Sequence, residues 1–219
     1  VISTLAREEA LFVFGEGPNG APFSDNPFFT RGLTPQQMAE LKTKKRDEQV
    51  NDPARPRWLQ MFDTDKKNLK KLADAGIKYG FGTDSGGALD RYFIQGWFEH
   101  RQMELMRDAG LTPMQIIMAF SKNNAEMLGI DKDFGTLAKG KAADLLVLSR
   151  NPLDDIANTR RIASVYLCGV QVNRTRSTCV HSSMLSIRTK CACSPRCASM
   201  PPSLTCCRTF GCRPIPWWM

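Results

Sequence analysis

Histidine and cysteine are almost missing from the first 174 residues, which contain only His100 and Cys168. One imidazole cannot supply the histidine ligands of a zinc site. A segment so poor in cysteine is typical of proteins in a reducing compartment, so we expect a cytoplasmic location. His100 lies in a polar stretch of helical character, and because a lone histidine there is more often a surface residue than a ligand, we expect it at the surface.

Long apolar runs are also missing. No segment approaches the ~18 consecutive apolar residues that a membrane-spanning helix needs, and residues 1–14 lack the basic start and the apolar length of a signal peptide. We therefore expect no membrane partner. The composition, 42% hydrophobic and 24% charged, is that of an ordinary globular protein. Because the first residue is Val1, we expect the chain to begin inside a longer reading frame.

Residues 175–219 contain no acidic residue, so they contribute most of the net positive charge of the whole chain. That stretch supplies +6 of the formal net charge of +8 and seven of the eight cysteines. Residues 1–174 are therefore nearly neutral. The basic balance of the chain does not indicate a nucleic-acid partner, because the excess sits in this tail.

Two interpretations of the tail, residues 175–219, remain open. Its cysteines could form a zinc or disulfide cluster, and the chain would then be a non-catalytic binding module. Their spacing, however, matches no paired C-x-x-C zinc pattern, and seven is an odd number for a disulfide framework. The abrupt change to Ser, Pro, Arg and Cys favours an atypical terminus, such as a read-through or a shifted frame, which we expect to be disordered.

Capping patterns predict several helices. Thr34 and Thr112 each precede a proline and stand three residues before a glutamine, which is typical of a helix start with a capping box. We expect helices over residues 34–48, from Asp63 or Thr64 to the glycine at 76, over 93–109, and from 112 through 128. Residues 15–32, rich in Gly, Pro, Asn and Asp, are expected to form a long loop, and such loops are often functional.

Strand patterns complete an α/β arrangement. Residues 1–5 are expected to form a short strand, and residues 77–83, which follow a helix and a glycine, a second one. Residues 145–148 form a continuous apolar run that predicts a strand buried on both faces, and the segments on either side of Cys168-Gly169 resemble a hairpin.

Asp84 is the strongest candidate for chemistry. It lies in Gly82-Thr83-Asp84-Ser85-Gly86-Gly87, directly after a predicted strand, where barrel enzymes carry their active-site residues. Its carboxylate could bind a metal or act as a general base, or it could simply form an Asx turn or cap a helix. The sequence has no nucleophile elbow, P-loop or dinucleotide-binding glycine pattern that would indicate another enzyme class.

Three stretches of the chain resemble the C-terminal part of the metal-dependent amidohydrolase superfamily, in its imidazolonepropionase-like and prolidase-like branch. They are residues 77–85 (IKYGFGTDS), 103–129 (MELMRDAGLTPMQIIMAFSKNNAEMLG) and 135–172, which begins GTLAKGKAADLLVLSRNPLDDI. The last is the most specific, with Gly135, Gly140, Lys141, Ala143, Asp144 and Asn151-Pro152-Leu153 at the family's positions. Residues 1–5 look similar to the preceding barrel strand.

The resemblance implies a (β/α)₈ barrel in which one or two divalent metals, with Zn²⁺ the first candidate, activate a water that hydrolyses a carbon–nitrogen bond. The substrate would be a small molecule: a non-peptide amide, a cyclic amide or a dipeptide-like compound. Asp84 matches the family's metal-binding and catalytic aspartate, which takes a proton from water and passes it to the leaving group.

The resemblance also implies that much of the enzyme is absent from this chain. Barrels of this kind need ~250 residues, and the family's other metal ligands are not in the sequence. We expect a C-terminal fragment: residues 1–134 as the last barrel strands and helices, 135–174 as part of a small β domain, and 175–219 as the tail. The isolated chain should be inactive, and its partner would be the missing N-terminal half of the barrel or a second copy.

Overall fold

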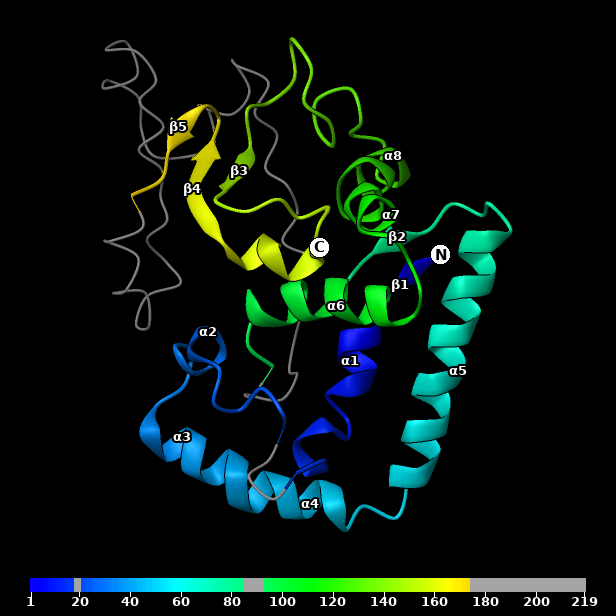
Figure 1. Ribbon diagram of the computed structural model, residues 1–219, viewed down its shortest axis with the longest axis vertical. Helices are drawn as coiled ribbons and strands as arrows, with labels where there is room; N and C mark the ends of the chain where they lie inside the picture. Colours follow the sequence, from blue (N-terminus) through cyan, green and yellow to red (C-terminus); the bar gives the residue numbers. More distant parts are fainter. Residues whose placement is uncertain (18–20, 85–92, 174–219) are drawn as a thin grey trace, which may run out of the picture. The chain divides into compact units, whose positions relative to one another are not determined.

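The first and second strands lie side by side, although nearly eighty residues separate them. The computed structural model describes residues 1–17, 21–84 and 93–173 (Figure 1). In it β1 (Ile2–Ser3) pairs in parallel with β2 (Gly80–Phe81), through hydrogen bonds of 2.8 Å from Gly80 N to Val1 O and 3.0 Å from Gly82 N to Ser3 O. The prediction of two such strands is confirmed. A parallel pair needs a crossover connection, and five helices supply it here.

The other edge of β2 is covered by side chains instead of a strand. The amide of Asn124 accepts from Phe81 N at 2.9 Å and donates to Phe81 O at 2.8 Å, and Asn123 donates to Tyr79 O at 2.9 Å. The absence of a side chain at Gly80 makes this possible, because a Cβ there would collide with Oδ1 of Asn124. Asn124 therefore satisfies the backbone groups that a neighbouring strand would otherwise pair with.

The crossover begins with α1 (Leu5–Glu9), the 3₁₀ turn η1 (Val13–Gly15) and α2 (Pro27–Thr30). The predicted helix over 34–48 is confirmed as α3 (Pro35–Glu40), a π-helical turn η2 (Leu41–Lys45) and α4 (Arg46–Val50). Its capping box is also confirmed: Gln37 N donates to Thr34 Oγ1 at 3.2 Å, and Thr34 N to Gln37 Oε1 at 2.8 Å.

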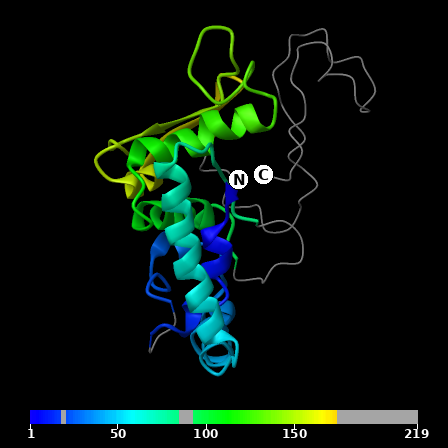
Figure 2. The same cartoon turned by 90° about the vertical axis from the view of Figure 1, so that its right-hand side faces the viewer.

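Helix α5 (Arg55–Asp74) begins well before the predicted caps at Asp63 and Thr64, so that prediction is wrong. Pro56 lies in the first turn of the helix, where no intrahelical bond to its nitrogen is needed, so it starts the helix instead of breaking it. Figures 1 and 2 both show α5 running alongside α1. Its end is as expected, because Gly76 has the left-handed φ of +68° that suits a C-terminal glycine.

The first helix described after β2 is α6 (Trp97–Asp108), which contacts α1, α5 and α7 (Pro113–Met118). The predicted capping box at Thr112 is present, with Gln115 N donating to Thr112 Oγ1 at 3.3 Å. A π-helical turn η3 (Ala119–Asn123) and α8 (Asn124–Met127) continue from α7. Among the described residues, no helix is both long and apolar enough to cross a membrane.

A small antiparallel sheet follows, with strand order β3 (Leu145–Leu148), β4 (Ile162–Leu167), β5 (Val170–Gln171). The predicted hairpin is confirmed: Cys168 and Gly169 both have positive φ, +50° and +77°, as a tight two-residue hairpin turn requires. The prediction that β3 is buried on both faces is wrong. Leu146 and Val147 are 46% and 42% exposed, so each face of the strand keeps a partly exposed side chain.

The core lies where the predicted loop over 15–32 meets α6. Phe23 and Phe29 from that segment pack against Trp97, with ring centroids 5.1 and 5.5 Å away, and Phe29 is fully buried. The segment is therefore anchored by aromatic side chains that the loop composition alone does not reveal. By its contacts the chain divides after Gln171, and residues from 174 onward, including the predicted tail, lie outside the described part.

His100 is buried, so the prediction of a surface residue is wrong. It is 9% exposed, and its Nδ1 lies 2.9 Å from Oγ1 of Thr159 in the 3₁₀ turn η4 (Ile156–Arg160). Thr159 Oγ1 also donates to Ile156 O at 2.9 Å, so it accepts from His100, which places the ring proton on Nδ1. Burial, together with the charge of Arg160, lowers the pKa of His100 to about 4.

We expect Asn124→Ala to lower the free energy of unfolding by about 1–3 kcal/mol, because it leaves the N–H and C=O of Phe81 without partners. Urea unfolding followed by circular dichroism measures the change. Asn51→Ala is the control: that amide donates to a carbonyl of its own helix at an exposed site, and the loss should stay near 0.5 kcal/mol. Equal losses in the two variants would contradict the bridging role of Asn124.

We expect His100 to make the fold less stable in acid. Its pKa is about 4 when folded, against 6.5 as the ordinary value, so the unfolded chain binds more protons between these values. Stability is therefore lost as the pH falls through that window. His100→Gln does not titrate. Between pH 7 and pH 4.5 the wild type should lose about 2–3 kcal/mol more than the variant in urea unfolding. The same loss in both chains would show that folding does not lower the pKa of His100.

Candidate functional site

Asp84 lies three residues after the last residue of β2, at the carboxyl end of the parallel pair, as the sequence predicts. Its φ is +52°, a left-handed conformation that few residues other than glycine adopt, and such conformations occur often at functional sites. Its side chain is 64% exposed. The carboxylate is thus presented outward from the end of the strand.

Arg7 is the partner of Asp84. It belongs to α1, which follows β1, and its Nε lies 3.1 Å from Asp84 Oδ2. The carboxyl ends of the two paired strands therefore bring together an acid and a base that are far apart in the sequence. Arg7 was not predicted as a site residue, because two residues so far apart in the sequence form no short motif.

Two more carboxylates lie near this end of the pair. Glu8 is adjacent to Arg7, and burial raises its pKa; Arg7 opposes this shift, and Asp65 and Asp84 add to it. Glu99 accepts from Thr83 Oγ1 at 3.5 Å and, as part of a capping box, from Gly96 N at 2.5 Å. Glu8 consequently keeps its proton to a higher pH than an ordinary glutamate. Its neighbour Arg7 forms the ion pair with Asp84.

The described residues do not by themselves form a metal site. Among residues 1–17, 21–84 and 93–173, no group of three or more His, Cys, Asp or Glu side chains could hold a metal ion. Asp84 alone offers one carboxylate, and a metal site of the expected kind needs three or more protein ligands. The three residues that follow Asp84 in its motif, Ser85, Gly86 and Gly87, lie outside the described part, as do all cysteines of the tail.

A second charged group lies along α6 and was missed by sequence reasoning. Arg101 binds Glu9 in a two-pronged pair, with Nη2–Oε1 at 2.6 Å and Nε–Oε2 at 2.9 Å, and Nη1 lies 3.2 Å from Glu104. Burial disfavours the charge of Arg101, but the hydrogen bonds and charges of Glu9 and Glu104 outweigh it and raise its pKa. Glu9 is buried, so this pair serves to join α1 to α6.

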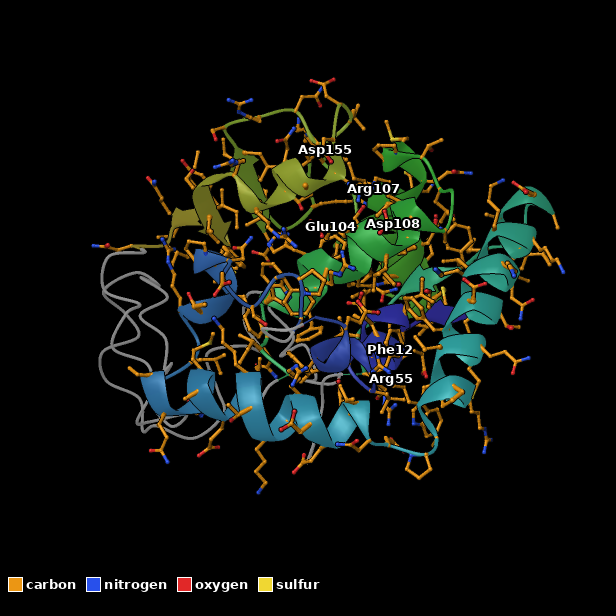
Figure 3. All side chains as sticks on the ribbon, turned by 60° about the horizontal axis from the view of Figure 1, so that its bottom comes forward. Phe12, Arg55, Glu104, Arg107, Asp108 and Asp155 are labelled. Atoms are coloured by element: carbon orange, nitrogen blue, oxygen red, sulfur yellow. The ribbon has the colours of Figure 1, made fainter. Side chains whose placement is uncertain are left out.

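At the other end of α6 the ion pairs are exposed. Figure 3 shows Arg107 among Glu104, Asp108 and Asp155, and its nearest oxygens are those of Asp108 at 2.8 Å and Asp155 at 3.3 Å. The pKa of Arg107 is raised, first by its hydrogen bond to Asp108. The side chains of Arg107, Asp108 and Asp155 are about half exposed, so this cluster resembles a solvated ion-pair network more than an active site.

Comparison with known proteins gives a consistent result. The model of the amidohydrolase family matches residues 25–172. A putative prolidase from Bifidobacterium longum is 28% identical, with a TM-score of 0.51 over 79% of this chain and 35% of the prolidase. A Xaa-Pro dipeptidase solved with bound methionine is 22% identical, with a TM-score of 0.49 over 67% of this chain and 34% of its own. No curated protein matches the chain significantly.

The matches cover most of this chain but only part of each solved protein. The chain spans about a third of the length of the solved proteins that it resembles. The family match covers most of the described residues, including both strands of the hairpin and Asp84. This chain belongs to the amidohydrolase family.

Proposed function

We propose that this chain is the C-terminal part of a hydrolase that cleaves carbon–nitrogen bonds in small molecules. Residues 1–134 would contribute the last strands and helices of a (β/α)₈ barrel, and residues 135–174 a small β domain. The family match over residues 25–172 is the observation that carries this proposal. The parallel pair β1–β2 agrees with it, because a helix follows each strand and α5 precedes β2.

Asp84 is the proposed catalytic residue. Its carboxylate stands at the carboxyl end of a parallel strand, exposed, where a barrel enzyme binds its substrate. Hydrolysis of an amide consumes one water, which must lose a proton, while the departing nitrogen must gain one. A carboxylate next to both can accept the proton from water and donate it to nitrogen. Arg7 would hold the carboxylate in position at the end of the strand.

A divalent metal, with Zn²⁺ as the first candidate, would polarise the substrate carbonyl and the water. Asp84 is the only described residue that we assign to it, and the remaining ligands would come from outside the described residues. The similarity to a putative prolidase supports a dipeptide-like substrate over the cyclic or non-peptide amides that the sequence also allows. A cytoplasmic location stays part of the proposal.

The missing part of the barrel is the proposed partner, or a second copy of the chain. Apolar side chains of the described strands face solvent: Ile2 is 54% exposed and Leu146 46%. In a chain that spans a third of its structural relatives, such surfaces are expected to be covered by the remaining two thirds.

We expect the isolated chain to hydrolyse no Xaa-Pro dipeptide, with or without added Zn²⁺, because one carboxylate is too weak a divalent site. Product release measured by chromatography tests this, with a complete prolidase as the positive control. Co-expression with the N-terminal part of the putative prolidase should restore activity. Hydrolysis by the isolated chain would contradict the fragment proposal. Failure to restore it, together with Zn²⁺ binding by residues 175–219, would favour the binding module instead.

In the restored enzyme we expect Asp84→Asn to lower kcat by about 10²–10⁴ and to change KM little, because the amide keeps the shape of the side chain but cannot accept the proton. Asp74→Asn is a matched control, since Asp74 pairs with Lys70 on the exposed face of α5, and its kcat should stay within twofold or so. A fully active Asp84→Asn enzyme would overturn the residue assignment without affecting the family.

A further inference from the structure

A cavity of about 410 Å³ opens beside α6, and its lining does not include Asp84. Its lining includes two aromatic side chains, Phe23 and Trp97, and four charged ones, Asp25, Arg101, Glu104 and Arg160. A cavity of this size suits a small organic molecule, and a few charged groups among aromatic walls are typical of ligand sites. The charged and polar groups of the cavity determine which kind of ligand it can bind.

The two arginines of the cavity differ in how they are satisfied. Arg101 uses Nε, Nη1 and Nη2 on the carboxylates of Glu9 and Glu104. Arg160 uses only Nη1, which lies 2.8 Å from Glu104 Oε1. Its Nε and Nη2 are buried and have no hydrogen-bond partner among the described residues. These two nitrogens form one edge of the guanidinium, the edge that binds the two oxygens of a carboxylate side by side.

Trp97 adds a third unsatisfied donor. Its side chain is almost fully buried, and its indole Nε1 has no partner in the described part of the chain. The guanidinium carbon of Arg160 lies over the Trp97 ring, 4.1 Å from the ring centroid, so the two side chains are in contact. Buried donors without partners are rare in folded proteins, and three on two neighbouring side chains at one cavity indicate a missing acceptor.

The charges around Arg160 favour a single negative charge. Burial lowers the pKa of Arg160, Glu104 opposes this effect, and the neighbouring Arg101 and Arg107 add to it. An anion against the open edge would relieve this cost. A doubly charged phosphate would face repulsion from Glu104 in the same cavity lining, whereas a carboxylate brings one charge and an apolar body for the aromatic side chains.

We propose that this cavity binds a small organic carboxylate, whose two oxygens accept from Nε and Nη2 of Arg160 while its apolar part packs against Phe23 and Trp97. The indole N–H of Trp97 supplies a further donor to the same ligand. Nothing in this site depends on the hydrolase proposal or on Asp84.

The test uses the full 219-residue chain labelled with ¹⁵N and titrated with sodium benzoate, at constant ionic strength, up to tens of millimolar. The Trp97 indole signal, assigned by its loss in Trp97→Phe, should shift and saturate. Benzamide, which has the same ring without the charge, should bind at least about tenfold more weakly. Equal shifts with benzoate and benzamide, or no saturable shift with benzoate, would overturn the proposal.

Two variants locate the site. Arg160→Lys keeps the charge beside Glu104 but loses the planar fork, and should weaken benzoate binding about tenfold or more. Arg107→Lys, which changes a residue of α6 outside the cavity lining, should bind as the wild type does. Unchanged affinity in Arg160→Lys would overturn the assignment.

Two further measurements on the wild type decide the matter even if Arg160→Lys fails to fold. The thermal midpoint should rise with benzoate and not with benzamide, since only a ligand of the folded state stabilises it. Inorganic phosphate should bind more weakly than benzoate; tighter binding of phosphate would contradict the preference for a carboxylate.

Discussion

The arrangement of β1, α1 and α6 depends on the hydrogen bonds of the buried amide of Gln102. Gln102 is fully buried in α6; its Oε1 accepts from Ala6 N at 2.6 Å, and its Nε2 donates to Ser3 O at 3.2 Å and Ser3 Oγ at 3.0 Å. One side chain therefore attaches α6 to the end of β1 and the start of α1. An amide so deeply buried is stable only with its partners in place. It thereby fixes where β1 lies, and with it the strand end at which Asp84 meets Arg7.

What could be predicted from the sequence was local. The capping boxes at Thr34 and Thr112 and the hairpin at Cys168-Gly169 depend on residues within three or four positions of one another, so their patterns were sufficient. The buried polar contacts were not predictable in this way. Gln102 and Arg101 find their partners more than ninety residues away. His100 was predicted to lie at the surface because its neighbours in the sequence are polar. The polarity of a short helical segment does not indicate which face of the helix the fold will cover.

The strand β3 illustrates a different limit. Its apolar run correctly predicted a strand, but the burial it implied is absent for Leu146 and Val147. A continuous apolar run indicates how much surface a strand is able to bury, and burial itself needs neighbouring elements. The candidate site is subject to the same limit. The position of Asp84 after a strand was predictable from the glycine-rich motif, whereas its pairing with Arg7 and the raised pKa of Glu8 depend on how β1 and β2 come together.

Two arginine–carboxylate pairs each include a residue of α1, and exposure, not strength of pairing, distinguishes the proposed catalytic acid from a structural one. Glu9 and Arg101 are 5% and 22% exposed, and removing one partner would leave a buried charge at a cost of about 3–5 kcal/mol. Asp84 and Arg7 are 64% and 34% exposed, and such a pair is worth about 0–1 kcal/mol. Asp84 can therefore leave its arginine for a water, a metal or a substrate at almost no cost in stability. Glu9, although better hydrogen-bonded, is committed to holding α1 against α6.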